Sequence, residues 1–392
     1  MADINRWVIE LRREFHRFPE LSGEERRTAA RVEEILGSLG IETRRVAGTG
    51  VVGLLRGGAG VKAPMKADGQ PRRTVALRAD MDALQQTEKT GLPFASENPG
   101  VMHACGHDSH VAMLLGAARA LAEQREALGG DVVFLFQPAE ELIDGAKGMI
   151  RDGALNGVDA VFGIHVFDNL PSGQVSLEPG PVLAGADIFK VTFRGKGGHG
   201  AMPYQGIDTI TPACYGLLGL QSMVVKELDA RRPVVLSVGQ IQGGTRFNII
   251  ADETWFHGSM RYFTPGTSDV MEEKIRRLVS GVALAHRNSV EVEYTRGVPP
   301  TVNDPALTAL ARQVATAEFG ESRLSRMDPV MGSEDFSYFA EKVPGVFACL
   351  GTHNEAKGMV YPNHHPQFTV DEDVLELGVK LHAGFAKAFL GK

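Results

Sequence analysis

Two kinds of apolar pattern alternate along the first third of the chain, and this alternation limits the fold more than any other feature. Residues 4–18 and 28–39 carry apolar side chains at helical spacing, and Pro19 and Gly40 end these segments. A further helix is expected after Asp108. Short, largely apolar runs that suit buried strands lie at residues 51–55, 74–78, 131–137 and 158–167. Apolar strands that alternate with helices indicate an α/β fold with a mainly parallel sheet covered on both faces.

The middle of the chain has a different order of elements. The pattern predicts strand, helix, strand, strand, helix and strand at residues 188–193, 207–226, 234–241, 254–262, 268–285 and 289–295. This is the order of a ferredoxin-like α+β unit. We therefore expect residues 1–184 and 298–392 to form one α/β domain, with residues 185–297 inserted in it. Residues 56–73, rich in Gly, Lys and Pro, are expected to form an exposed hairpin or loop.

The composition is that of a globular protein and excludes some classes of partner. With 41 Lys and Arg against 48 Asp and Glu, the chain lacks the basic face that nucleic-acid binding requires. No uncharged apolar stretch approaches the roughly 20 residues of a membrane helix, and the N-terminus lacks the features of a signal peptide. Cys105, Cys214 and Cys349 are odd in number and widely spaced. We therefore expect no disulfide framework and a cytoplasmic location.

Several potential metal ligands follow the predicted strands. Asp80 comes after residues 74–78, Glu140 and Glu141 come after residues 131–137, and His165 is expected to end its strand. The carboxyl ends of parallel strands form the crevice in which open α/β sheets bind ligands. Taken singly, each of these residues also has a structural interpretation. A histidine at a strand end is commonly hydrogen-bonded, and a Glu-Glu pair commonly opens a helix.

The segment from His103 to His110 is harder to explain by packing. Its eight residues include three histidines, Cys105 and Asp108, ahead of a predicted helix. Histidine and cysteine are typical ligands of transition metals, whereas a thiolate does not suit a pure magnesium or calcium site. Zinc, manganese, cobalt or nickel are therefore expected. His16, Cys214 and Cys349 are expected to be structural, the two cysteines as small core residues.

The adjacent carboxylates Glu140 and Glu141 have a chemical use beside such a site. One can ligate a metal ion while the other takes a proton from metal-bound water. Hydrolysis of an amide requires this division of roles.

These residues resemble the amidohydrolase subgroup of metallopeptidase family twenty, which includes hippurate hydrolase, N-acyl-amino-acid amidohydrolases and plant hydrolases of indole-acetyl-amino acids. The matching segments are 77–84, 103–110 and 137–141, together with 12–20, 195–199, 332–336 and 364–368. They occur in the expected order from about residue 6 to 375, so the resemblance covers nearly the whole chain.

The resemblance implies a role for each matching residue. The implied ligands of two divalent metal ions are Cys105, His107, Glu141, His165 and His364. Glu140 becomes the general base, acting on a metal-bridging water, and Asp80 orients a ligand from behind. His365 adjoins His364 and is the alternative last ligand. Relatives outside the subgroup have a histidine where this chain has Arg78. Manganese or zinc is expected first, with cobalt or nickel as alternatives.

The resemblance also makes the inserted domain a lid through which two chains dimerise. His199 is implied to reach the substrate carbonyl, and Asn248 and Arg261 suit the substrate carboxylate. The implied activity is hydrolysis of N-acyl amino acids such as hippurate. A dipeptidase or carboxypeptidase with the same metal ions is the alternative enzyme, and a non-catalytic binding protein is the alternative outside enzymes.

Overall fold

The computed structural model describes residues 2–58 and 72–391, which form two compact units. Unit 1 holds the described residues of Met1–Val182, Val302–Asp328 and Asp335–Lys392. Unit 2 holds Leu183–Thr301 and Pro329–Glu334. The second segment of unit 2 was not expected, because it lies outside the range 185–297. Most of the loop predicted at residues 56–73 lies outside the described residues.

Unit 1 is built on a seven-stranded sheet with the order β1-β2-β4-β3-β5-β15-β6. The strands are β1 (Glu42–Val46), β2 (Gly50–Leu55), β3 (Thr74–Asp80), β4 (Asp131–Gln137), β5 (Ala160–Pro171), β6 (Val175–Ser176) and β15 (Gly345–His353). The four central strands β4, β3, β5 and β15 pair in parallel. This confirms the predicted α/β class. The edge pairs β1–β2 and β15–β6 are antiparallel, and a connection as short as that between β1 and β2 allows no crossover helix.

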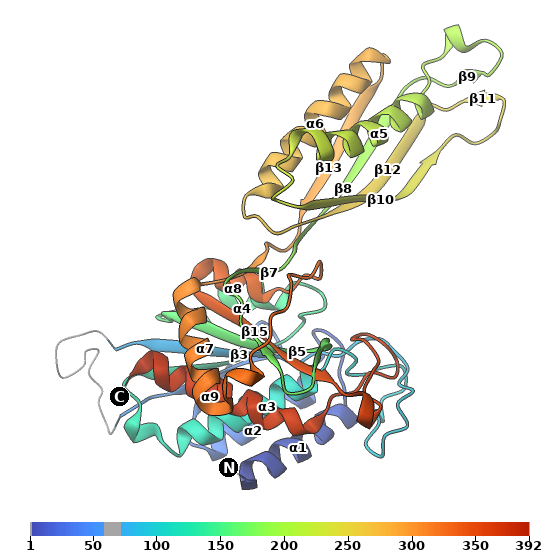
Figure 1. Ribbon diagram of the computed structural model, residues 1–392. Coiled ribbons are helices and arrows are strands. Elements are labelled where there is room, and N and C mark those ends of the chain that lie inside the picture. Colours follow the sequence, from blue (N-terminus) through green and yellow to red (C-terminus); the bar gives the residue numbers. More distant parts are fainter. Residues whose placement is uncertain (1, 59–71, 392) are drawn as a thin grey trace. The chain divides into compact units, whose positions relative to one another are not determined.

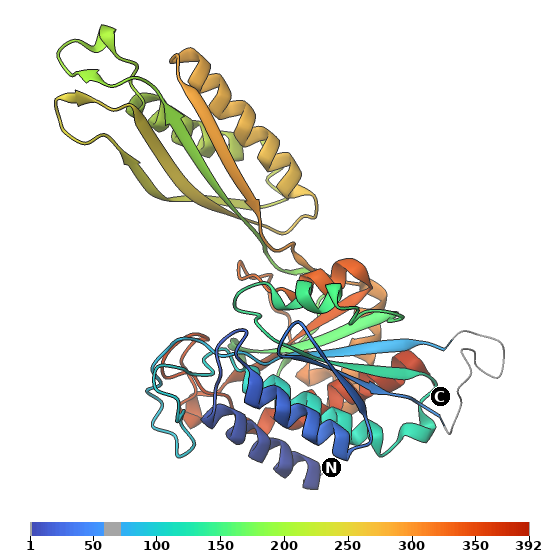
Figure 2. The same ribbon diagram turned by 180° about the vertical axis from the view of Figure 1, so that it is seen from behind.

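Helices cover both faces of this sheet (Figures 1 and 2). They are α1 (Ala2–Arg17), α2 (Arg26–Ser38), α3 (His107–Ala122), α4 (Gly145–Arg151), α7 (Pro305–Phe319), α8 (Phe336–Lys342) and α9 (Leu375–Leu390). One layer contains α1, α2, α3 and α9, and α4 and α8 lie on the opposite face. Because α3 packs against α1, α9 and β3, nearly all of its side chains are buried. The first turn of α3 is therefore held in place by this packing.

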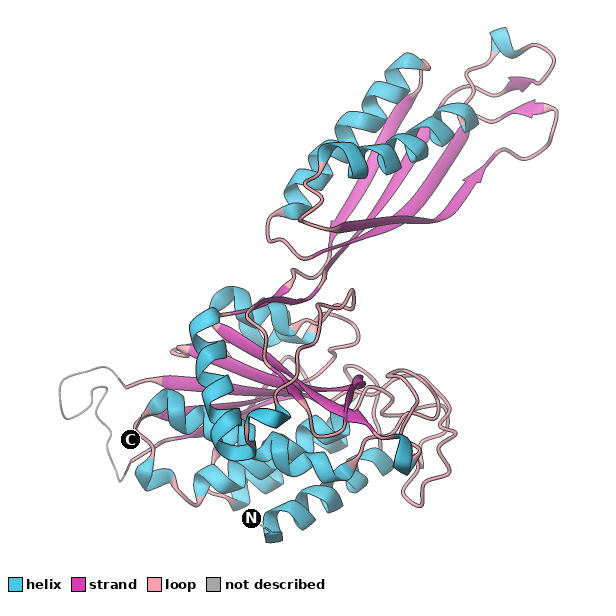
Figure 3. Ribbon diagram, viewed as in Figure 1, coloured by secondary structure: helices cyan, strands magenta, loops and turns pink. Residues whose placement is uncertain are grey.

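Unit 2 contains a four-stranded antiparallel sheet with the order β10-β12-β8-β13. Its elements are β8 (Gly185–Arg194), β9 (Gly198–His199), α5 (Ile210–Glu227), β10 (Val234–Gly243), β11 (Ile249–Ile250), β12 (Glu253–Tyr262), α6 (Thr267–Ala285) and β13 (Ser289–Arg296). Both helices lie on the same face of the sheet (Figure 3). The order of elements and of strands is ferredoxin-like. The strands β7 (Gly180–Leu183) and β14 (Thr301–Asn303), where the chain passes between the units, pair with each other.

The two cysteines outside the histidine-rich segment differ in burial. Cys349 is buried as expected, but Cys214 is exposed on α5. The buried face of that helix is formed instead by Pro212, Ala213, Gly216, Leu220 and Met223.

Among the described residues, no helix is long and apolar enough to cross a membrane.

Candidate metal centre

Side chains from separate parts of unit 1 meet beyond the carboxyl end of β3. Cys105 precedes α3, His107 opens that helix, Glu141 follows β4, His165 lies on β5, and His364 lies between β15 and α9. The turn from Cys105 into α3 requires Gly106, whose φ is +89°. A Cβ at this position would lie 2.3 Å from Cγ2 of Val166, so no other residue fits. The local backbone thus directs Cys105 and His107 to the same centre.

The distances within this cluster suit metal binding. Sγ of Cys105 lies 3.4 Å from Nε2 of His165 and 3.2 Å from Nε2 of His364. Nε2 of His364 lies 3.3 Å from Oε1 of Glu141. The potential ligand atoms of Cys105, His107 and His165 all lie within 4.8 Å of one another, and so do those of Cys105, Glu141 and His364. Cys105 belongs to both groups, so its sulfur can bridge two ions.

Hydrogen bonds to the protein backbone orient two of the histidines. Nδ1 of His107 donates to the main-chain oxygen of Asp82 at 2.9 Å, with Oδ1 of Asp82 at 3.2 Å. Nδ1 of His165 donates to the main-chain oxygen of Val166 at 2.7 Å. When either ring is neutral, its proton therefore sits on Nδ1, and Nε2 keeps the lone pair that a metal ion needs.

The chemistry of the donor set also fits a cation. Nε2 of His107 is buried and makes no ordinary hydrogen bond among the described residues, and an orphaned buried atom of this kind requires an explanation. Burial raises the pKa of the Cys105 thiol to about 12. A bound cation reverses this effect, because it deprotonates a coordinating thiol. Burial lowers the pKa of His107, but the charges of Asp80 and Cys105 and the hydrogen bonds to Asp82 and Cys105 together outweigh it and raise that pKa well above its usual value.

Asp80 lies behind the cluster, where its side chain adjoins His107, His110 and Arg78. Its Oδ1 accepts a hydrogen bond from Nδ1 of His110 at 2.5 Å, and its Oδ2 accepts one from Arg78 at 2.6 Å. Burial opposes ionisation, yet the Arg78 guanidinium together with His107 and His110 holds the pKa of Asp80 well below its usual range. Nε2 of His110 then accepts from the backbone N–H of Val166 at 3.0 Å, next to His165.

Both carboxylates therefore adjoin the candidate ligand His107, since Oδ1 of Asp82 lies 3.2 Å from its Nδ1 and Oδ2 of Asp80 lies 3.7 Å from its Nε2. Sequence reasoning missed both Asp82 and His110. Their signal was present, since Asp82 belongs to the same segment as Asp80 and His110 ends the histidine-rich segment. Choosing between Asp80 and Asp82 requires knowledge of which side chain points toward α3.

One expectation about position needs correction. His165 does not end its strand, because β5 continues to Pro171 alongside β15. The pairing of β5 with the neighbouring strand β3 stops earlier, at Gly163 and Arg78. His165 therefore lies beyond the paired part of β5 and level with Asp80, the last residue of β3. Of the adjacent C-terminal histidines, His364 joins the cluster, whereas His365 stacks on Tyr361 with ring centroids 4.6 Å apart.

Glu140 lies beside the cluster with only 7% of its surface exposed. Three side chains here offer potential ligand atoms within 4.8 Å of one another. They are the carboxylates of Glu140 and Glu141 and the imidazole of His107. Glu140 is therefore within reach of a water molecule held at the cluster, as a general base must be.

The other candidate residues belong to unit 2, and two of them lie together. His199 on β9 pairs with Ile249, and the N–H of Gly200 donates to the main-chain oxygen of Asn248 at 2.9 Å. The N–H of Ala201 donates to Nδ1 of His199 at 3.0 Å. Nε2 of this exposed imidazole can therefore carry the proton and donate it to a ligand.

Arg261 lies at the opposite end of β12 from His199 and Asn248. It pairs with Ala186 and Val235 and donates to Oγ of Ser333. Gly195 lies between β8 and β9, and its N–H donates to the main-chain oxygen of Asp252, just before β12 begins. The β9–β11 pair therefore lies near the end of β12 that begins at Glu253. One strand length, more than about 20 Å, therefore separates Arg261 from His199.

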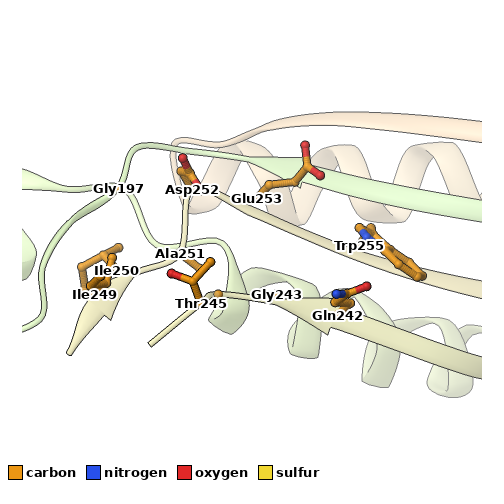
Figure 4. Close-up of a pocket in the computed structure, with 11 residues that line it drawn as sticks. Gly197, Gln242, Gly243, Thr245, Ile249, Ile250, Ala251, Asp252, Glu253 and Trp255 are labelled. Atoms are coloured by element: carbon orange, nitrogen blue, oxygen red, sulfur yellow. The ribbon is translucent and has the colours of Figure 1, made fainter. Parts of the chain in front are cut away.

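A pocket of about 410 Å³ opens at the β9–β11 end of unit 2 (Figure 4). Its polar lining comes from Gln242, Thr245, Asp252 and Glu253, and Trp255 closes one side. No histidine or cysteine lines it. All of its lining residues belong to unit 2, whereas the candidate metal centre belongs to unit 1.

Comparison with known proteins gives matches along the whole chain. Residues 76–388 match the model of peptidase family M20/M25/M40. Thermostable carboxypeptidase 1 of Saccharolobus solfataricus is 41% identical and is matched over 100% of this chain and 98% of its own length. An IAA-amino acid hydrolase of Arabidopsis thaliana is 40% identical over 98% of this chain and 85% of its own. An N-acetyl-L-cysteine deacetylase of Bacillus subtilis is 38% identical over 96% and 86% of the two chains.

A solved structure resembles the chain over nearly its full length. It is a dinuclear metal-binding peptidase of the M20 family from Bacillus subtilis. The sequences are 33% identical, the TM-score is 0.84, and the match covers 98% of each chain.

Proposed function

The chain belongs to peptidase family M20/M25/M40 and is a hydrolase, and on that premise we propose that it is a metal-dependent amidohydrolase of N-acyl amino acids. The observation that carries this proposal is the pair of ligand groups that share Cys105, with the Glu140 carboxylate beside them. A relative that deacetylates N-acetyl-L-cysteine supports the substrate class.

Each side chain of the centre has a proposed role. Cys105, His107, Glu141, His165 and His364 would hold two divalent cations, manganese or zinc first and cobalt or nickel as alternatives, which polarise the amide carbonyl and acidify water when bound. His107 and His165 present Nε2 to the centre because their Nδ1 atoms are engaged. Asp82 and the Asp80–His110 pair keep the ligands in position.

Glu140 is proposed to carry the proton through the reaction. Its carboxylate accepts a proton from the attacking water as the water oxygen bonds to the carbonyl carbon. The same proton passes to the amide nitrogen as the C–N bond breaks, which releases a carboxylic acid and the free amino acid. Nε2 of His199 donates to the carbonyl oxygen, where negative charge develops. Asn248 and Arg261 are proposed to bind the substrate carboxylate.

The test of this mechanism is the Glu140→Gln variant. An amide of the same shape cannot accept the proton, so turnover of an N-acyl amino acid is expected to fall by about 10²–10⁴-fold while two metal ions per chain remain. Activity within tenfold of the wild type would refute the base assignment. Loss of metal would make Glu140 a ligand instead.

A carboxypeptidase is the second candidate function, because a carboxypeptidase is among the full-length relatives. The two candidates are separated by comparing kcat/KM for hippurate and N-acetyl amino acids with kcat/KM for unblocked dipeptides. We expect the blocked substrates to be preferred. A preference for free N-termini would reject the N-acyl proposal and leave the metal centre unaffected.

We also propose that the chain works as a homodimer formed through unit 2. His199 and Arg261 are too far apart in one chain to contact one N-acyl amino acid. If both serve the same reaction, two copies of unit 2 must contribute to each site. Catalysis would then require a partner chain.

The surface of unit 2 offers one sheet edge that suits such a partner. The edge strand β10 carries no charged residue, whereas the other edge, β13, carries Glu291, Glu293 and Arg296. Charges on an edge strand prevent pairing with another sheet. The adjacent helix α5 exposes Leu218 at 64% and Val225 at 73%. An isologous pairing of β10 with β10 would cover this apolar surface.

Complementation between two inactive variants tests the shared site. Glu140→Gln retains His199, and His199→Ala retains Glu140, so a mixed dimer has one complete site if His199 acts on the partner's centre. After unfolding and refolding together, an equal mixture should recover about a quarter of wild-type activity, because half of its dimers are mixed. Activity no higher than the sum of the separate variants would reject the shared site.

A further inference from the structure

The turn that carries Glu140 has a backbone conformation that alanine and isoleucine rarely adopt. Ala139 has φ +50° and Ile143 has φ +59°, both in the left-handed region. Each such residue strains the folded chain, because its Cβ comes too close to the following carbonyl oxygen. Gly145 allows the turn to close, since a Cβ there would lie 1.6 Å from the main-chain oxygen of Pro138. The shape of the turn must therefore be maintained by contacts outside it.

One of these contacts comes from Glu25, which lies just before α2 and far from the turn in sequence. Oε1 of Glu25 accepts hydrogen bonds from the N–H of Ala139 at 2.8 Å and of Gly23 at 2.9 Å. Oε2 accepts from the hydroxyl of Thr49. The side chain is fully buried, and burial raises its pKa. Among the described residues, no ion pair involves it, so its contacts to the turn are hydrogen bonds alone.

A second carboxylate holds the other side of Glu140. The N–H of Glu141 donates to Oδ2 of Asp82 at 3.0 Å, and Oδ1 of Asp82 contacts Nδ1 of His107 at 3.2 Å. Glu25 thus holds the peptide between Pro138 and Ala139, and Asp82 holds the peptide between Glu140 and Glu141. Removing the contact to Glu25 frees the φ angle of Ala139, while Asp82 still holds the proposed ligand Glu141.

We propose that Glu25 is a positioning residue for proton transfer, which holds Ala139 in its left-handed conformation and so sets the position of the Glu140 carboxylate. This inference rests on the proposed role of Glu140 as the base. Its consequence is a separation of effects, in which a change at Glu25 lowers kcat without releasing metal.

Two substitutions of Glu25 separate the effect of side-chain length from the effect of charge. Glu25→Gln keeps the length and an oxygen that accepts from Ala139, so kcat should stay within about threefold of the wild type. Glu25→Asp keeps the charge but withdraws the carboxylate, so kcat should fall by at least tenfold with KM within threefold, since a misplacement of about 1 Å lowers turnover by up to 10²-fold. Both variants should bind two metal ions per chain, measured by elemental analysis after dialysis.

Substitutions elsewhere provide the controls. Glu20→Asp alters another carboxylate that accepts backbone N–H groups, from Arg27 and Thr28, and should leave kcat unchanged. Asp82→Ala should lose metal as well as activity, because Asp82 contacts His107. Adding Ala139→Gly to Glu25→Asp should restore part of kcat, because glycine reaches φ +50° without strain.

Three results would overturn the inference. They are wild-type kcat in Glu25→Asp, loss of metal from Glu25→Asp, or no recovery when Ala139→Gly is added. If Glu140→Gln is inactive while both Glu25 variants have wild-type kcat, the inference fails and the proposed function stands. If Glu140→Gln is active, the proposed mechanism fails first.

Discussion

Cys105 is the residue on which both ligand groups depend, because its sulfur belongs to each of them. Cys105→Ala should therefore weaken binding of both metal ions, by at least the 10–100-fold that loss of a supporting contact causes. Metal titration of the purified protein measures this effect.

Cys349→Ala is the matched control, because Cys349 is also buried but belongs to none of the ligand groups. It should retain both ions. Two ions bound with wild-type affinity in Cys105→Ala would exclude a bridging sulfur.

His16 makes the stability of unit 1 depend on pH. Burial and the charge of Arg12 lower its pKa. Hydrogen bonds to Asp108 at 2.8 Å and Glu88 at 3.2 Å, together with the charge of Asp108, outweigh them, so the pKa is raised. A raised pKa means that protonated His16 stabilises the fold fully below the unfolded value of about 6.5 and that this contribution is lost as pH rises through the folded value.

Denaturant unfolding of the wild type and His16→Asn measures this contribution. The difference between their free energies of unfolding should be larger at pH 6 than at pH 9. Comparing two proteins removes the other titrating groups, including Asp108, whose pKa is lowered. A difference that does not change with pH would show that His16 stabilises the fold by packing alone.

Helix α3 carries Cys105 and His107 at its start, so its packing sets the position of the centre. Gly116 lies where α3 meets α1 and α9, and a Cβ there would lie 2.6 Å from both Val8 and Val379. Gly116→Ala gains about 0.5–1 kcal/mol of helix propensity but forces overpacking that destabilises by about 1–3 kcal/mol. Overpacking wins, so we expect a net loss of about 1–2 kcal/mol in the free energy of unfolding.

Gly37→Ala on α2 isolates the propensity effect, because nothing lies within 4 Å of a Cβ at that position. It should stabilise unit 1 by up to about 1 kcal/mol. Denaturation curves of the two variants should therefore shift in opposite directions, and a shift in the same direction would contradict this packing argument.

The two units have separate cores, so metal should stabilise them unequally. One buried cluster joins α1, α3, α9 and the seven-stranded sheet, and another joins α5, α6 and the sheet of unit 2. A ligand stabilises only the structure that binds it, by about 4 kcal/mol when its concentration is 1,000 times Kd. Chelation should lower the melting temperature of unit 1 and leave that of unit 2 unchanged.

Calorimetry of the metal-loaded and chelated protein checks this prediction, and unit 1 is identified by the effect of Gly116→Ala on the same transition. Equal shifts of both transitions would mean that the units unfold together. In that case the separate cores do not unfold independently.

Features that depend on neighbouring residues could be predicted from the sequence. The alternation of apolar strands and helices indicates the α/β class of unit 1, and the order of segments between residues 188 and 295 agrees with the ferredoxin-like sheet of unit 2. The histidine-rich segment directs attention to Cys105 and His107, because their spacing of two is short enough for one turn to bring both to one point. These patterns are local, so side-chain periodicity is sufficient to find them.

Other features depend on contacts between elements far apart in sequence. Strand register and the direction in which a side chain points decide three of them. These are the contact of Asp82 with His107, the position of His165 level with the end of β3, and the hydrogen bond from Ala139 to Glu25. The separation of Arg261 from His199 likewise depends on the length of β12. Periodicity specifies which face of an element is buried but not which distant residue it meets, because that choice is made only when the elements pack.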